Sequence, residues 1–432
     1  MRNEAIMPSH DPICVPPSIT DPASFGFHSC PGGICAAQGI SAAGIHAGFR
    51  ADPNRKDLAL VAADATCACA ATFTKNQFCA APVQVSRERA ATGRARAVIL
   101  NSGNANASTG EPGVRCALAS AKLVADALGC AEQEVLVAST GVIGVQMPLE
   151  PYITGVPEAV SALAPTAEAA HDAARAVMTT DTVSKEVSLE GTIGHDEPIT
   201  VHVGGFVKGS GMIMPNMATM LCVLSTDAPL TADAAQSALS SAVSQTFNKV
   251  TVDSDTSTND TCILLATGAA GGPAIGVDSP DFPALSAAIR CACENLARKI
   301  AADGEGATKL VTVDVVGAAT DEDADTVARS IANSPLVKTA IFGHDANWGR
   351  VAGAAGKCGV PFDQYQVDID FLGVPVLRAG LPLPMDEQDM LRRFEEPEIA
   401  IAVNLGVGDC SARIWTCDLT HDYVTINGDY RT

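Results

Sequence analysis

The stretch Lys208-Gly-Ser-Gly-Met-Ile-Met-Pro-Asn-Met-Ala-Thr-Met-Leu221 is the most informative part of the chain. Its glycines and Pro215 permit or impose unusual backbone geometry, and the apolar run Met220–Leu224 is typical of a buried strand. A strained turn that leads into a rigid strand would point the hydroxyl of Thr219 at the preceding carbonyl group, that of Ala218. The segment therefore indicates a self-cleaving loop, cut between these two residues.

A cut at this bond would give Thr219 its own base. The hydroxyl of threonine is a weak nucleophile until a base takes its proton, and a free α-amine has a pKa close to neutrality. The alternative is that the glycines and the proline mark a surface loop and that Thr219 opens an edge strand. A phosphate-binding loop fits less well, because it needs a lysine after its last glycine and here Lys208 precedes Gly209.

At these residues the chain resembles the glutamate N-acetyltransferases of arginine biosynthesis, also called ornithine acetyltransferases. The segment Lys208–Leu221 is similar to the autocleavage segment of that family. The similarity extends from about Gly39 to Thr432. Other stretches fit the family in its order: Asn101–Ala107, Ser139–Gly144, Met178–Thr182, Thr251–Asp260, Asp303–Thr308 and Ile426–Tyr430.

The resemblance implies an α/β (α+β) fold, with an αββα-type sandwich as main domain and a second, smaller α/β domain. We expect a poorly ordered tail at residues 1–28, the main domain at 29–320 and the smaller domain at 321–432. The cut would yield an alpha chain of residues 1–218 and a beta chain of residues 219–432. The family assembles as two copies of each, so a heterotetramer is implied.

The pattern of apolar residues favours alternating helices and strands. Helices are expected at Gly113–Leu128, with Gly129 as C-cap, from Thr231 as N-cap, at Leu285–Ala301 and at Asp386–Phe394. Strands are expected at Ala97–Leu100, Glu134–Ala138, Thr200–Phe206, Met220–Leu224, Thr261–Ala266, Lys309–Val316 and Glu398–Asn404.

Thr140 and Gly141 are the candidates for an oxyanion hole. They follow the apolar stretch Val135–Ala138, and a glycine lets a backbone N–H approach a reacting carbonyl closely. Without the family, Ser139-Thr-Gly is an ordinary turn. The resemblance assigns the oxyanion hole to this pair.

The candidate substrate-binding residues carry opposite charges. Lys208 could hold a substrate carboxylate, although it could equally be a solvated loop lysine. Glu305, between two glycines, could hold a δ-ammonium, although it could also simply end a helix. By resemblance both bind substrate. So do Thr180 of the pair Thr179-Thr180, Asn427 and Thr432, which implies that the C-terminus folds back over the active site.

The implied reaction is a ping-pong acetyl transfer. Thr219 takes the acetyl group from N2-acetyl-L-ornithine and passes it to L-glutamate; acetyl-CoA is a second possible donor, and no metal or organic cofactor is needed. Two other classes stay open. One is a related self-processing amidohydrolase or aminopeptidase that uses water, and the other is a non-catalytic binding protein of the same fold.

The composition argues against nucleic acid and membrane partners, and the resemblance implies small-molecule substrates. The chain has 432 residues, 47% of them hydrophobic, and its 28 basic and 49 acidic residues give a charge of −21, which argues against nucleic acid. It has no apolar run of about 18 residues that would suggest a spanning helix, and its start, with Glu4 and Asp11, is not a signal peptide. We therefore expect a cytoplasmic protein with no membrane partner.

Three further clusters suggest chemistry that their spacing does not support. The 15 cysteines include Cys67-Ala-Cys69 and Cys291-Ala-Cys293, whose spacing is too short for usual zinc sites. The run Asp253–Asp260 resembles the start of a calcium loop but lacks its glycine and glutamate, so we interpret it as a hydrogen-bonded turn near the site. His344 beside Asp345 suggests a base and its orienter, yet adjacent residues rarely pair so.

Overall fold

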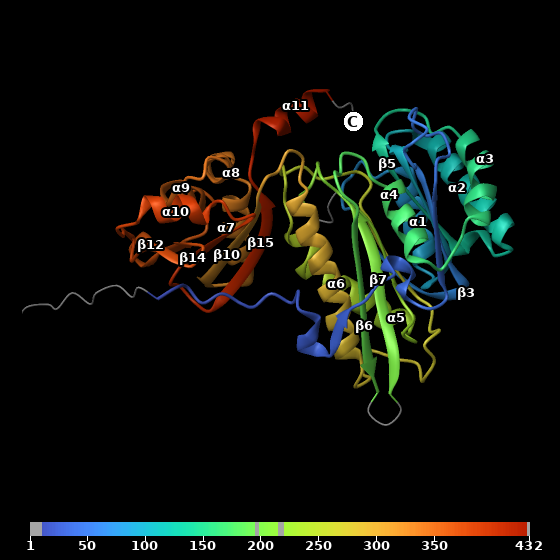
Figure 1. Cartoon of the computed structure of the whole chain (residues 1–432), viewed down its shortest axis with the longest axis horizontal. Helices are drawn as coiled ribbons and strands as arrows, with labels where there is room; N and C mark the ends of the chain where they lie inside the picture. The colour runs from blue at the N-terminus through green and yellow to red at the C-terminus, as the bar shows by residue number, and fades with distance from the viewer. Residues whose placement is uncertain (1–10, 195–197, 215–219, 430–432) are drawn as a thin grey trace, which may run out of the picture. The chain divides into compact units, whose positions relative to one another are not determined.

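The computed structural model describes residues 11–194, 198–214 and 220–429. The chain forms two compact units. The larger unit contains Ile19–Asn248 and Asp255–Ile300, and the smaller unit contains Ala301–Asp429, Lys249–Ser254 and the residues up to Ser18. Both units mix helices and strands (Figure 1).

The described strands of the larger unit form one sheet in the order β1-β6-β7-β8-β9-β3-β4-β5, with β2 paired to β3. The strands are β1 (Phe27–Ser29), β2 (Ile40–Ile45), β3 (Leu58–Phe73), β4 (Arg94–Asn104), β5 (Val135–Val142), β6 (Lys185–Ile193), β7 (Ile199–Lys208), β8 (Leu221–Thr226) and β9 (Thr261–Ala266). The helices are α1 (Ala81–Ala90), α2 (Gly110–Leu128), α3 (Glu150–Ser161), α4 (Ala167–Ala176), α5 (Ala232–Gln245) and α6 (Phe282–Ala302).

The sheet folds back on itself at the long strand β3. The first part of β3 pairs with β2 and β4, whereas its last residues pair with β9. Strands β5 and β8 approach each other although three strands separate them in the sheet order. One core cluster accordingly joins Leu136 on β5 with Phe206 on β7 and Val223 on β8.

Helices cover the two outer faces of the folded sheet. On one side Leu60, Ile99 and Val137 pack with residues of α2 and α3. On the other side α5 packs on β3 and β9, and Cys293 of α6 lies beside Cys222 of β8. The layers are therefore helix, sheet, sheet and helix, so the predicted αββα-type fold is confirmed.

The smaller unit is built on a second sheet. Its described strands lie in the order β13-β12-β11-β14-β10-β15. They are β10 (Leu310–Ala318), β11 (Asp368–Phe371), β12 (Val374–Arg378), β13 (Leu381–Pro382), β14 (Glu398–Asn404) and β15 (Cys410–Cys417). The helices are α7 (Asp321–Ala332), α8 (Pro335–Phe342), α9 (Trp348–Gly356), α10 (Glu387–Arg393) and α11 (His421–Asp429).

The predicted helices and strands are present. Thr231 accepts a hydrogen bond from the backbone N–H of Ala234 as the N-cap of α5, and Gly129 ends α2 in the left-handed conformation, with φ of 67°. Strands β8 and β9 are buried along their whole length, which explains why their sequences are continuous apolar runs. None of the described helices combines the length and the apolar character that crossing a bilayer requires.

The units divide the chain at other points than the boundaries expected near residues 28 and 320. Strand β10 pairs with β14 and β15 and so belongs to the smaller unit. The described part of the first 28 residues also makes defined hydrogen bonds: Ile13 N–H donates to Asp370, and Arg413 donates to the carbonyl oxygen of Pro16. Such long-range partners cannot be read from local composition.

Phe206 tests the shared core between the two halves of the sheet. Its side chain is fully buried there, so Phe206→Ala should lower the free energy of unfolding by about 3–5 kcal/mol. Phe78→Ala, at a side chain that is 74% exposed, is the control and should change stability by less than about 0.5 kcal/mol. Urea unfolding measures both, and equal effects would contradict the folded-sheet core.

Candidate active site

Thr140 and Lys208 meet at one end of the folded sheet of the larger unit. Thr140 lies near the end of β5 and Lys208 is the last residue of β7. The Nζ atom of Lys208 donates a hydrogen bond to Oγ1 of Thr140 over 3.3 Å, and the two residues are 4% and 7% exposed. Two residues predicted from separate motifs are thus brought into contact.

Gly141 is placed by a close approach of two strands. Its φ of 133° is unfavourable for other residues, and a Cβ atom would overlap the backbone of Gly103 on β4. The ladder is irregular at this point, because Asn104 pairs with both Thr140 and Val142. A bulge next to Thr140 is typical of strand ends that carry a functional group.

Asp181 compensates the charge of two buried lysines. Its Oδ1 atom accepts hydrogen bonds from Nζ of Lys185 and from the backbone N–H of Gly209, both over 2.7 Å. Burial alone would raise the pKa of Asp181, but the charges of Lys185 and Lys208 hold this pKa at about 2. Asp181 therefore stays ionised and fixes the backbone directly after Lys208.

Thr180 lies in the loop between α4 and β6 and is half-buried. Arg50 donates to the carbonyl oxygen of Met178, and Arg55 donates to that of Thr179, both over 3.0 Å. The Oδ2 atom of Asp181 accepts the backbone N–H of Thr179 over 3.0 Å. This loop is held on both sides of Thr180, which leads directly into Asp181.

Asp260 stands at the start of β9, next to the start of β8. Its Oδ1 atom accepts the backbone N–H of Met220 over 3.0 Å. Burial, as the largest effect, raises the pKa of Asp260 well above its usual value, although Met220, Lys208 and two nearby hydroxyls act in the opposite direction. A buried carboxyl group thus binds the residue that directly follows Thr219 in the sequence.

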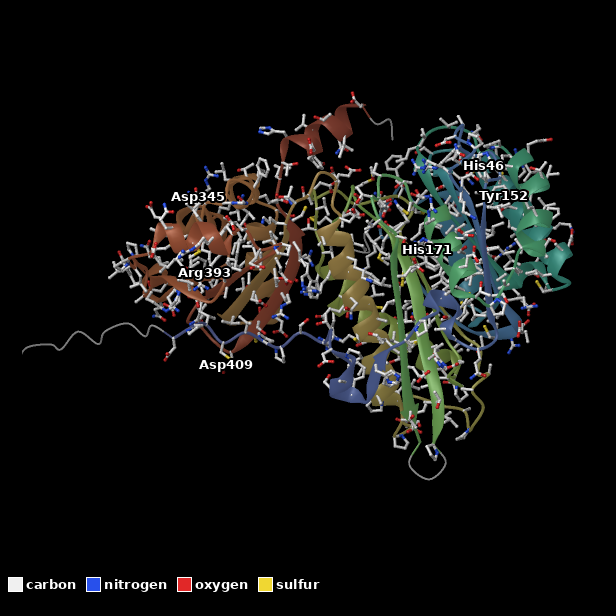
Figure 2. The ribbon with its side chains drawn as sticks, in the orientation of Figure 1. His46, Tyr152, His171, Asp345, Arg393 and Asp409 are labelled. Atoms are coloured by element: carbon white, nitrogen blue, oxygen red, sulfur yellow. The ribbon has the colours of Figure 1, made fainter. Side chains whose placement is uncertain are left out.

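Asn259 ties this loop to the end of β5. Its Nδ2 atom donates to the carbonyl oxygens of Ala105 and Ser139, over 2.6 and 2.8 Å. The run Asp253–Asp260 is a hydrogen-bonded turn, as interpreted from the sequence. On β4, Asn101 makes a similar polar bridge, because it accepts the hydroxyl of Tyr152, labelled in Figure 2, over 2.9 Å.

Glu305 and Asn427 meet in the smaller unit. The Nδ2 atom of Asn427 on α11 donates to Oε2 of Glu305 over 2.7 Å, and Glu305 is buried. Gly306 has φ of 70°, and a Cβ atom there would overlap the backbone of Tyr423. The C-terminal helix therefore packs closely on the loop that carries Glu305.

Three predicted site residues, Ala218, Thr219 and Thr432, lie outside the described residues. The chain is described up to Met214 and again from Met220. The hydroxyl of Thr256 donates to the carbonyl oxygen of Met214 over 3.0 Å, so the turn before β9 holds both ends of this segment.

The sequence-based predictions missed the roles of Asp181 and Asp260. Asp181 lies within the quoted stretch Met178–Thr182, directly after Thr180, and Asp260 ends the stretch Thr251–Asp260; these positions are the only local signal. His344 and Asp345 do not form a dyad: Asp345, labelled in Figure 2, instead accepts a hydrogen bond from Asn347 over 2.9 Å. The φ of 55° at His344 belongs to the turn after α8.

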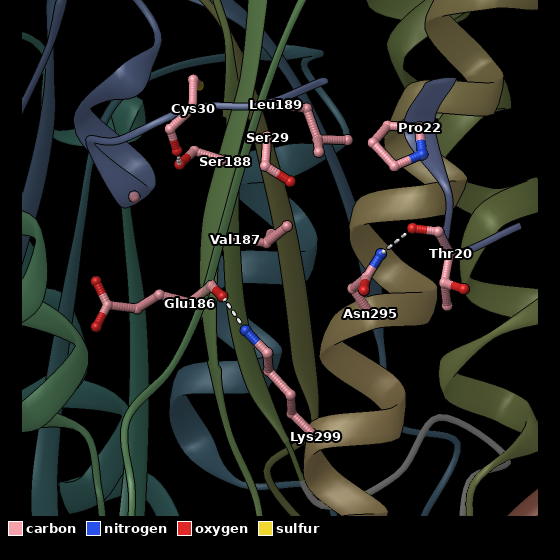
Figure 3. A pocket seen from close by; sticks show the side chains of 11 residues that line it. Thr20, Pro22, Ser29, Cys30, Glu186, Val187, Ser188, Leu189, Asn295 and Lys299 are labelled. Carbon is pink, nitrogen blue, oxygen red and sulfur yellow. Dashed lines mark hydrogen bonds between the residues drawn. The ribbon is translucent and has the colours of Figure 1, made fainter. Parts of the chain in front are cut away.

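The described residues contain no group of three or more His, Cys, Asp or Glu side chains placed to hold a metal. A cavity of about 300 Å³ lies beside β6 and α6, and Lys299 donates there to the carbonyl oxygen of Glu186 over 2.5 Å. Figure 3 shows the side chains that line it. No predicted site residue lines this cavity. The candidate active site is therefore the Thr140 and Lys208 region, with Asp181 and Asp260 beside it.

Known proteins match this sequence along nearly the whole chain. The model of the ArgJ family matches residues 41–432. The arginine biosynthesis bifunctional protein ArgJ of Symbiobacterium thermophilum is 47% identical over 402 residues, which covers 93% of this chain and 99% of the relative. The protein of the same name from Thermosynechococcus vestitus is 45% identical over 418 residues, which covers 93% of this chain and 98% of the relative.

A solved structure is also similar. The crystal structure of the arginine biosynthesis bifunctional protein from Bacillus halodurans is 43% identical in sequence. The match covers 47% of this chain and 96% of that chain, with a TM-score of 0.46.

Asp181 offers a test of the buried charge cluster. Asp181→Asn leaves two buried lysines without their shared carboxylate, so it should lower the free energy of unfolding at pH 7 by about 3–5 kcal/mol. Because the folded-state pKa is low, the stabilisation is complete above pH of about 4 and is lost as the pH falls towards 2. Urea unfolding between pH 7 and pH 3 measures the difference.

The matched control is Asp126→Asn, which removes the carboxylate of an exposed pair with Lys122. It should leave the unfolding midpoint nearly unchanged at every pH. If Asp181→Asn were equally harmless, the charge cluster would not contribute to stability.

Proposed function

Because the chain belongs to the ArgJ family, we propose that it is an acetyltransferase of arginine biosynthesis in which Thr219 carries the acetyl group between two substrates. The donor is N2-acetyl-L-ornithine and the acceptor is L-glutamate. The main support from the fold is the contact between Thr140 and Lys208 at the sheet end from which β7 leads towards the predicted cut. The names of the relatives, which are called bifunctional, support acetyl-CoA as a second donor.

The first step is the cut itself. The Oγ1 atom of Thr219 attacks the carbonyl carbon of Ala218, the peptide C–N bond breaks, and the nitrogen takes up the proton that the hydroxyl loses. Water then hydrolyses the resulting ester. The products are a chain of residues 1–218 and a chain of residues 219–432 whose first residue carries a free α-amine and a free hydroxyl.

Acetyl transfer uses the same two groups. The α-amine of Thr219 accepts the hydroxyl proton while Oγ1 bonds to the acetyl carbon of N2-acetyl-L-ornithine. The proton then passes to the leaving nitrogen of ornithine as its C–N bond to the acetyl group breaks. The amine of L-glutamate then attacks the acetyl carbon of the acetyl-threonine, the ester bond to Oγ1 breaks, and Oγ1 takes up the proton that the attacking amine loses, which releases N-acetyl-L-glutamate.

We assign the oxyanion hole to Thr140 and Gly141. The hydroxyl oxygen of Thr140 already accepts a hydrogen bond from Lys208, so its own proton remains available to donate to the carbonyl oxygen of the acetyl group. The backbone N–H of Gly141 is the second donor. The charge of Lys208 would further stabilise the negative oxygen in this buried place.

Substrate recognition is assigned to charged and polar groups. Lys208 and Thr180 would bind the carboxylate end of the amino acid, and Glu305 would bind the δ-ammonium of ornithine. Asn427 and Thr432 complete the set. The hydrogen bond between Asn427 and Glu305 supports a shared role for this pair.

The family resemblance supports further assignments. We propose a heterotetramer of two alpha and two beta chains, located in the cytoplasm. The substrates are small molecules, and the chemistry of Thr219 requires no metal and no organic cofactor.

Thr219→Ala tests the nucleophile. The variant lacks the hydroxyl, so it should stay uncut and lose acetyl transfer by about a thousandfold or more. Intact mass under denaturing conditions and an assay that forms ornithine from N2-acetyl-L-ornithine measure the two effects. Thr154→Ala, at an exposed position of α3, is the control and should be cut and active.

An assay with and without the acceptor L-glutamate distinguishes acetyl transfer from simple hydrolysis. Wild-type protein should form N-acetyl-L-glutamate in proportion to ornithine when L-glutamate is present. Ornithine release that is independent of L-glutamate would instead favour an amidohydrolase. A wild-type chain that stays intact would contradict the proposal altogether.

A further inference from the structure

The carboxyl group of Asp260 uses only one of its two oxygens. The side chain is buried, with 1% exposure, and Oδ1 accepts the backbone N–H of Met220 over 3.0 Å. The Oδ2 atom has no hydrogen-bond partner among the described residues, although the hydroxyls of Thr74 and Ser257 lie nearby. Buried polar atoms are rarely left without a partner, so such an atom calls for a functional explanation.

The hydroxyl groups near Asp260 belong to one hydrogen-bonded loop. The Thr74 hydroxyl donates to the carbonyl oxygen of Ser257 over 2.8 Å, and the Ser257 hydroxyl accepts the backbone N–H of Asn259 over 3.1 Å. Asn259 in turn holds the carbonyl oxygens of Ala105 and Ser139. These hydrogen bonds hold the loop in place. A loosely held side chain therefore does not explain why Oδ2 lacks a partner among the described residues.

The position along the chain connects this carboxyl group to the nucleophile. Strands β8 and β9 are parallel and in register, with Leu221 opposite Thr261, so Asp260 stands opposite Met220. Met220 directly follows Thr219, and consecutive Cα atoms lie about 3.8 Å apart. The N–H of Met220 belongs to the peptide bond that joins Met220 to Thr219, so a group that binds this N–H acts on that peptide unit.

We propose that Asp260 is a positioning residue for the nucleophile: Oδ1 fixes the backbone after Thr219, and Oδ2 is reserved for the α-amino group that cleavage creates. This inference rests on the proposed function. During acetyl transfer the amine takes the hydroxyl proton and becomes a cation in a buried place. A carboxyl group beside it stabilises that cation and orients its lone pair towards the hydroxyl before the transfer.

The variant Asp260→Asn distinguishes the roles of the two carboxyl oxygens. Asparagine keeps the size of the side chain and an oxygen that accepts the N–H of Met220, but it replaces the second oxygen with an NH₂ group that cannot pair with an ammonium. The full-length variant should fold. Its cleaved form should have a kcat about 100-fold below wild type, with the KM for N2-acetyl-L-ornithine within about threefold of wild type.

Asp227→Asn is the matched control. Asp227 is a fully buried carboxylate at the other end of β8, and its oxygens accept hydrogen bonds from the backbone N–H groups of His202 and Gln38. Its replacement should lower the melting temperature but leave cleavage, kcat and KM as in wild type. The kcat effect at Asp260 then cannot come from the loss of a buried carboxylate alone.

Each outcome decides. A cut Asp260→Asn with a kcat about 100-fold below wild type supports the positioning role, whereas a cut variant with wild-type kcat, or a folded variant that stays uncut, overturns it. If Asp260→Asn does not fold, Asp260→Glu, which displaces the carboxyl group by one methylene, decides: a tenfold loss of kcat at constant KM supports the role and wild-type kinetics exclude it. Wild-type protein that is uncut or inactive would refute the proposed function instead.

Discussion

The site depends on two lysines that are buried with one ionised aspartate. Asp181 accepts a hydrogen bond from Lys185, and the charges of Lys185 and Lys208 both hold its pKa low, so the three side chains form one buried charge cluster. The same carboxylate holds the backbone N–H of Gly209, which fixes where the chain leaves β7. The position of Lys208 against Thr140, and with it the start of the segment that precedes β8, follows from this cluster.

The fold brings these groups together by bending one sheet. Strand β3 pairs with β4 in its first part and with β9 in its last, so β5 and β7 end on facing layers. The glycine pair Gly103 and Gly141 allows β4 and β5 to approach more closely than side chains would permit. Asn259 then joins the turn before β9 to the end of β5, and the polar groups of four strands share one end of the sandwich.

The sequence predicted much of this arrangement, and the gaps have a physical cause. Continuous apolar runs identified β8 and β9, and the motifs around Thr140 and Lys208 indicated residues that prove to be in contact. The roles of Asp181 and Asp260 were not predicted, because their partners, Gly209 and Met220, lie far away in sequence. These residues become neighbours only through strand pairing. Strand β3 was not predicted either, because its Ala-rich sequence with Asp64 in the middle lacks the alternation of a strand with one exposed face.

The strand order has a consequence for a chain that is cut between Ala218 and Thr219. Strands β8 and β9 come from the second fragment, yet they are inserted between β7 and β3 of the first. The fragments would share one sheet and one core, so the break leaves the native topology in place and the pieces cannot part without unfolding. Once unfolded, however, they would have to find each other in solution, so refolding would become a second-order reaction that dilution slows. After cleavage of this kind, unfolding in dilute solution would be practically irreversible, because refolding would be too slow.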